Sequence, residues 1–150
     1  MTTSSARRRS RELTLQGLYQ RQLSGNDAAE VRNDLAASKG YERADRAYFE
    51  ELWQGVTRDY DSLVATVEPH LARKAAELSP IERAILVIAA WELKSRLDIP
   101  YRVVINEAVE LAKAYGGTDG HKFVNGVLDR HAASVRAAEI GARARESGLS

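Results

Sequence analysis

The stretch Ser79–Leu97, with the sequence SPIERAILVIAAWELKSRL, decides the fold of this chain. Ser79 suits a helix N-cap, Pro80 suits the first helical position, and Glu82 completes a capping box. From Ala84 onward the segment is apolar on nearly every side. Because a helix that is hydrophobic all round is buried by other elements, we expect a central helix with the others packed around it.

The rest of the chain shows the spacing of amphipathic helices. Apolar residues recur at three- and four-residue steps in three further stretches: Phe49, Leu52, Trp53, Val56, Tyr60, Leu63, Val64, Val67 and Leu71; Val104, Ala108, Leu111 and Tyr115; and Val124, Leu128, Ala132 and Val135. The first stretch is long for one helix, so we expect a break near 57–59. No run alternates in the manner of a strand. The sequence predicts an all-α single domain of six or seven helices.

Capping residues and glycines mark the ends of several helices. Asp27 and Glu30 form a weaker capping box, which opens a short helix ending near Gly40. The Gly-Gly pair at 116–117 predicts the end of one helix, and the Thr-Asp pair at 118–119 can cap the next.

Three glycines lie inside predicted helices, where each costs about 1 kcal/mol against alanine. This cost indicates close helix–helix approach at Gly17, Gly55 and Gly126. We place one helical domain at 1–137 and, because the pattern then fades, a flexible C-terminal tail at 138–150.

Composition excludes several classes of protein. The chain has 150 residues, 44% of them hydrophobic and 29% charged, which is ordinary for one soluble globular domain. It has no cysteine, so disulfide scaffolds, cysteine zinc sites and thiol catalysis are excluded. The longest apolar run, Ala84–Trp91, is far below the ~20 residues that span a bilayer. No secretory signal is visible at the N-terminus, and we expect a cytoplasmic protein.

Positive charge is concentrated at the start of the chain. Residues 1–24 hold five arginines and one glutamate, a net charge of +4, whereas the whole chain carries only +1. On a helix, Arg7, Arg8 and Arg11 fall on the face that Leu15 and Leu18 continue. Since arginines cannot be buried unpaired, we expect this start to overhang the body or to be disordered until something binds. It is either a solvated, fraying end or an arginine-rich arm that grips RNA phosphates.

No motif predicts catalysis or a resident cofactor. The chain has no P-loop, no nucleophile elbow and no dinucleotide-binding glycine motif. The histidines are His70, His121 and His131, and no two have the i, i+4 spacing of helical zinc ligands. We expect no enzyme activity, no metal and no cofactor.

Three blocks of sequence carry a family resemblance. They are RRRSRE at 7–12 with QGLY at 16–19, IPYRVVINEAVELAK at 99–113, and HKFVNGVLD at 121–129. In order and spacing they resemble the NusB family of bacterial transcription antitermination factors. The likeness runs from about Ala6 to Arg136.

The resemblance implies a fold of two small helical subdomains and a function without a reaction. It implies binding to boxA, a U-rich single-stranded RNA element of ribosomal RNA leaders. The implied protein partner is NusE, which is also a small-subunit ribosomal protein. Together they join an antitermination complex on RNA polymerase and support ribosomal RNA synthesis.

The resemblance also implies the roles of particular residues. The RNA-contacting positions that match are Arg7, Arg8, Arg11, Gln16 and Tyr19 in the first block, and Asp119, Lys122 and Phe123 near the third. For Phe123 the alternative is a core residue, and for Tyr19 likewise. Glu82 matches the NusE-facing surface, although it can equally close the capping box. Two other functions stay open: an accessory RNA-binding domain in ribosomal RNA modification or ribosome assembly, and a purely structural interaction domain.

Overall fold

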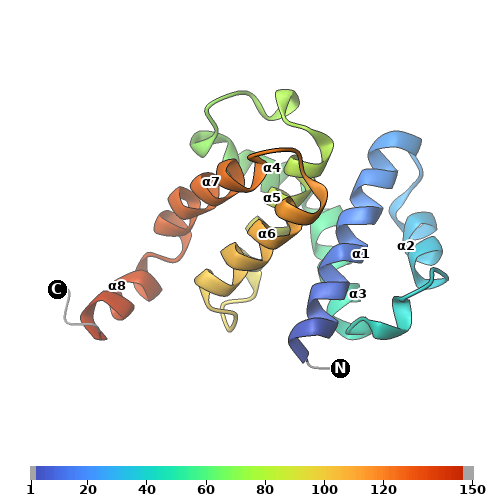
Figure 1. Ribbon diagram of the computed structural model, residues 1–150, viewed down its shortest axis with the longest axis horizontal. Coiled ribbons are helices and arrows are strands. Elements are labelled where there is room, and N and C mark those ends of the chain that lie inside the picture. Colours follow the sequence, from blue (N-terminus) through green and yellow to red (C-terminus); the bar gives the residue numbers. More distant parts are fainter. Residues whose placement is uncertain (1–2, 147–150) are drawn as a thin grey trace.

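The computed structural model describes residues 3–146, and every regular element in that range is a helix (Figure 1). The α-helices are α1 (Thr3–Ser24), α2 (Ala28–Ala36), α3 (Arg46–Arg58), α4 (Tyr60–Val67), α5 (Pro80–Ser95), α6 (Tyr101–Tyr115), α7 (Gly120–Val135) and α8 (Ala137–Glu146). Short 3-10 helices lie at Tyr41–Arg43, Glu68–His70 and Ala75–Glu77. The all-α prediction is confirmed, with eight α-helices in the described range instead of six or seven.

Helix α5 is the centre of the molecule, as its sequence predicts. The ten consecutive residues from Ala84 to Leu93 are all buried. Helices α1, α3, α4, α6 and α7 all pack against it. At its start the Ser79 hydroxyl accepts a hydrogen bond from the Glu82 N–H at 3.1 Å and donates to the Glu82 carboxylate at 3.0 Å. The predicted cap is therefore present.

The remaining helices form two groups about α5. Helices α1, α2 and α3 lie together on one side, and α4, α6, α7 and α8 on the other (Figure 1). The predicted break is confirmed, since α3 ends at Arg58 and α4 begins at Tyr60. Helix α2 begins after the Asp27 cap and ends at Ala36, short of the predicted Gly40. Just past its last turn, the Ser38 hydroxyl donates to the Leu35 carbonyl.

Close approach at glycine is confirmed at two of the three predicted positions. A Cβ atom on Gly17 would lie 2.6 Å from the Trp53 ring, and one on Gly55 would overlap the Trp91 indole. These contacts join α1 to α3 and α3 to α5. The prediction is wrong for Gly126, where only the flexible end of Arg130 comes near.

The segment that follows α7 is held by polar contacts that the sequence pattern does not reveal. Arg136 is buried and donates to the carbonyl oxygens of Glu92 and Leu93 at the end of α5. Glu139 accepts from the Tyr101 N–H at the start of α6 at 3.0 Å. These bonds satisfy helix-end groups, so the chain continues as α8 instead of losing its regular structure at 138. Its flexibility stays a prediction, and residues 147–150 lie outside the described range.

Candidate nucleic-acid interface

One face of α1 presents a row of polar and aromatic side chains. Arg8, Glu12, Gln16 and Tyr19 follow one another at intervals of three and four residues, which places them on the same side of the helix. Arg8 and Gln16 are exposed, and Tyr19 keeps 38% of its surface accessible. The alternative of a core tyrosine is therefore wrong, and the accessible ring is available for stacking, which stays a prediction.

The junction between α6 and α7 lies beside this row. The Tyr115 hydroxyl at the end of α6 donates to the Glu12 carboxylate at 2.9 Å. Burial, followed by Glu12, raises the pKa of this tyrosine above its usual range. The hydrogen bond places the end of α6, and the loop that follows it, next to the middle of α1.

The loop leads into exposed charged residues at the start of α7. Asp119 takes a left-handed backbone conformation with φ of 65°, and its side chain makes no cap hydrogen bond, contrary to the capping prediction. Its carboxylate instead lies 3.3 Å from the Lys122 ammonium. Both side chains are largely exposed, so they are accessible to a ligand.

Phe123 lies half-buried beside these charges. Its ring packs against the hydrophobic core on one side. The Arg73 guanidinium lies 4.8 Å from the centre of the ring and 3.8 Å from the Glu82 carboxylate. The structure thus brings Glu82, which also serves the α5 cap, next to the start of α7.

Arg11 does not overhang the body. Its side chain is 4% exposed, and its Nε and Nη2 donate to the Glu92 carboxylate at 2.9–3.1 Å. Glu92 is 1% exposed and also accepts from the Tyr48 hydroxyl. Burial alone would lower the pKa of Arg11, but Glu92 raises it above the ordinary arginine value. Burial, followed by Glu92, likewise raises the pKa of Tyr48.

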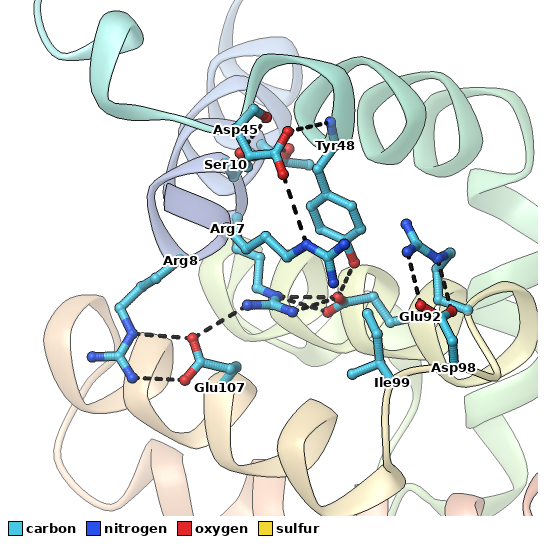
Figure 2. Close-up of polar contacts among 12 residues, drawn as sticks. Arg7, Arg8, Ser10, Asp45, Tyr48, Glu92, Asp98, Ile99 and Glu107 are labelled. Atoms are coloured by element: carbon cyan, nitrogen blue, oxygen red, sulfur yellow. Dashed lines mark hydrogen bonds and ion pairs between the residues drawn. The ribbon is translucent and has the colours of Figure 1, made fainter. Parts of the chain in front are cut away.

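For the start of the chain as described, from Thr3 onward, the expectation of an overhanging or disordered arm is therefore wrong, as is that of a solvated, fraying end. A buried carboxylate supplies the partner that the physical argument required. Arg7 is also docked: its guanidinium lies 4.7 Å from the centre of the Tyr48 ring, and its Nε lies 3.8 Å from the Asp45 carboxylate (Figure 2). Arg7 and Arg11 thus hold α1 against the body.

Arg8 alone of the three predicted arginines projects from the surface. Its Nε and Nη2 donate to the two Glu107 oxygens at 3.0 and 2.6 Å, a fork-on-fork arrangement (Figure 2). The hydrogen bonds to Glu107 raise the pKa of Arg8. A hollow of about 390 Å³ beside it is lined by Ser5, Arg8, Arg9, Glu12 and Arg43. This hollow suits an anionic group, and the sequence pattern did not single out Arg9 or Arg43 as part of a site.

Several residues that form or support this surface were not predicted from the sequence. They are Tyr48, Arg73, Glu92 and Glu107, which act through contacts between distant helices. Glu92 had a detectable signal, because a carboxylate inside a helix that is apolar all round needs a buried cation. Among residues 3–146 no three histidine or acidic side chains are grouped so that they could hold a metal ion.

Comparison with known proteins places this geometry in a family. The NusB family model matches residues 8–133, which include the row on α1 from Arg8 to Tyr19 and the α6–α7 junction. The chain belongs to the NusB family. It is 55% identical to the transcription antitermination protein NusB of Paraburkholderia phymatum over 142 residues, which cover 95% of this chain and 98% of that protein. It is also 55% identical to NusB of Ralstonia nicotianae, covering 93% and 90% of the two chains.

Solved NusB structures share the fold. The T. maritima NusB structure superposes with a TM-score of 0.76 at 30% identity, over 85% of this chain and 91% of that one. A chain from the crystal structure of antitermination factors NusB and NusE in complex with dsRNA gives 0.71 at 25% identity, over 84% and 95%. Within the described residues, no helix has the length and apolar character needed to cross a membrane.

Proposed function

We propose that the chain is a non-enzymatic RNA-binding antitermination factor of the cytoplasm. It binds boxA-type single-stranded leader RNA together with NusE, joins the RNA polymerase antitermination complex and supports ribosomal RNA transcription. The observation that carries the proposal is the Tyr115–Glu12 hydrogen bond, because it joins the α1 row and the α6–α7 junction on one surface. The solved NusB–NusE complex with RNA supports both partners.

The exposed side chains of this surface supply two kinds of RNA contact. Arg8 and Lys122 are cations that pair with phosphates, which gives affinity without sequence preference. Tyr19 and Phe123 offer partly exposed rings for base stacking. Gln16 and Asp119 are exposed groups that can form hydrogen bonds to base edges.

Arg7 and Arg11 enter this proposal as positioning residues. They are held by Tyr48, Asp45 and Glu92 inside the molecule, so their effect on RNA passes through the docking of α1. Glu82, together with Arg73 beside it, forms part of the NusE-facing surface. This surface adjoins Phe123, so NusE can extend the RNA site directly.

The test is a pair of titrations with a boxA-type RNA and a scrambled RNA of equal length. We expect the wild-type protein with NusE to prefer the boxA-type RNA. Lys122→Ala should weaken binding to both RNAs and reduce the slope of log affinity against log salt by about 0.7, as expected for one lost phosphate contact. Lys94→Ala is the matched control, since Lys94 is an exposed lysine in the last turn of α5, at the opposite end from Glu82. Equal affinity for the two RNAs, or equal effects of the two variants, would contradict the proposal.

A further inference from the structure

The contact between Arg8 and Glu107 reproduces the way in which arginine holds a phosphate. Two parallel N–H groups of the guanidinium meet two oxygens at 3.0 and 2.6 Å (Figure 2). A phosphate offers the same pair of oxygens to the same edge of arginine. In the free protein, this edge of Arg8 is therefore occupied by a carboxylate of the chain itself.

Glu107 is not needed to neutralise the buried arginine nearby. Its Oε1 accepts a hydrogen bond from Arg11 Nη1 at 3.3 Å, but the charge of Arg11 is already matched by Glu92, and an amide oxygen at position 107 can still accept from Nη1. Glu92 is 1% exposed, whereas the Glu107 side chain is 14% exposed and that of Arg8 is 51% exposed. The Arg8–Glu107 pair therefore lies at the surface, where an ion pair is weak enough for a ligand to exchange.

Arg8 lies between two hollows of opposite character. On one side, a groove of about 150 Å³ between α1 and α6 is lined by Arg8 with three carboxylates, those of Glu12, Glu107 and Glu110. On the other side is the basic hollow that Arg8 shares with Arg9 and Arg43. In the free protein, Arg8 bonds to the Glu107 carboxylate of the acidic groove. Released from Glu107, it can add its charge to the basic hollow.

We propose that Glu107 sets the RNA affinity of this surface by occupying the phosphate-binding edge of Arg8, so that RNA must displace the carboxylate in order to gain that contact. This inference rests on the proposed RNA-binding function. The residues of the proposed function all provide RNA affinity, whereas Glu107 lowers it. Because a phosphate contact carries no sequence information, Glu107 acts on the boxA-type and the scrambled RNA alike.

The test is Glu107→Gln, which keeps the size of the side chain and removes its charge. RNA affinity should rise about three- to fivefold, the scale of a surface ion pair. The slope of log affinity against log salt should steepen by about 0.7, because one more phosphate is contacted. Glu110→Gln is the matched control: Glu110 lies one turn along the same helix and lines the same groove, but pairs with Lys113.

The second arm measures Glu107→Gln in an Arg8→Ala background. The gain should vanish there, because the released arginine is absent. Should Glu107→Gln fail to fold by circular dichroism, Glu107→Asp replaces it. Its side chain is one methylene shorter, so its carboxylate cannot reach both Arg8 nitrogens, and the gain should be smaller. A gain equal to that of Glu110→Gln, no gain in either Glu107 variant, or a gain that survives without Arg8 would overturn the inference. Failure of the proposed function looks different: the wild-type protein would then show no preference for the boxA-type RNA.

Discussion

Arg11→Met should destabilise the protein, although Arg11 belongs to the basic block that the family likeness assigns to RNA. Methionine keeps the apolar stem but removes the cationic partner of Glu92, which is 1% exposed. Among residues 3–146, Glu92 then keeps only the Tyr48 hydroxyl as a side-chain donor. Removing one member of a buried ion pair costs about 3–5 kcal/mol, because a buried charge is left uncompensated. For a domain of this size, about 2–4 °C are lost per kcal/mol, so Tm should fall by about 6–20 °C.

The assay is thermal unfolding followed by circular dichroism, with Arg8→Ala as the control. Arg8 is half-exposed, so its loss should cost at most about 1 kcal/mol. A second substitution, Glu92→Gln, in the Arg11→Met chain removes the stranded charge and keeps an acceptor for Tyr48. It should recover more than half of the lost stability. A Tm for Arg11→Met within about 2 °C of the wild-type value, or no recovery by Glu92→Gln, would refute the buried-pair reasoning.

Three further predictions follow from the packing and the pKa values. Phe123→Ala should lose about 1–3 kcal/mol of RNA-binding free energy, because a base can no longer stack on the ring. The ring is half-buried, so the variant should also lose about half of the 3–5 kcal/mol of stability that removal of a core phenylalanine costs. Unchanged RNA affinity of the folded protein would refute the stacking role. Gly55→Ala should lower the free energy of unfolding by about 1–3 kcal/mol or more, because the added methyl group overlaps Trp91. Gly126→Ala should be neutral or stabilising by up to about 1 kcal/mol. Chemical denaturation that ranks the two variants the other way would refute the packing argument. Burial, followed by His70, lowers the pKa of His131 below 6.5. The unfolded chain therefore takes up the proton first, and stability should fall as the pH drops below about 6.5. His131→Gln should flatten this loss in denaturation measured across pH, and an unaltered pH profile would contradict the prediction.

The helices could be predicted because their signals are local. The Ser79 cap, the apolar run from Ala84 and the 3.6-residue stripes each depend on residues within one or two turns. The structure departs from the predictions where the outcome depends on contacts between distant segments. Arg11 meets a carboxylate 81 positions further along the chain, and Arg136 meets the end of α5. Spacing along one helix does not reveal such partners.

The candidate site divides along the same line. Its exposed row, from Arg8 to Tyr19, could be placed on one helix face by spacing alone. That the α6–α7 junction lies beside this row depends on Tyr115 reaching Glu12 across 103 positions. Likewise, the number of arginines in the first block did not show which of them RNA could reach. Only burial separates Arg8 from Arg11.

A calorimetric cycle tests the central claim most directly, namely that this chain and NusE form one composite RNA surface. The binding of boxA-type RNA is measured with and without NusE, and the binding of NusE with and without the RNA. We predict that NusE tightens RNA binding by about 1–3 kcal/mol, the usual range for coupling between sites, and that RNA tightens NusE binding by the same factor. RNA and NusE affinities that are independent of each other would contradict the composite surface.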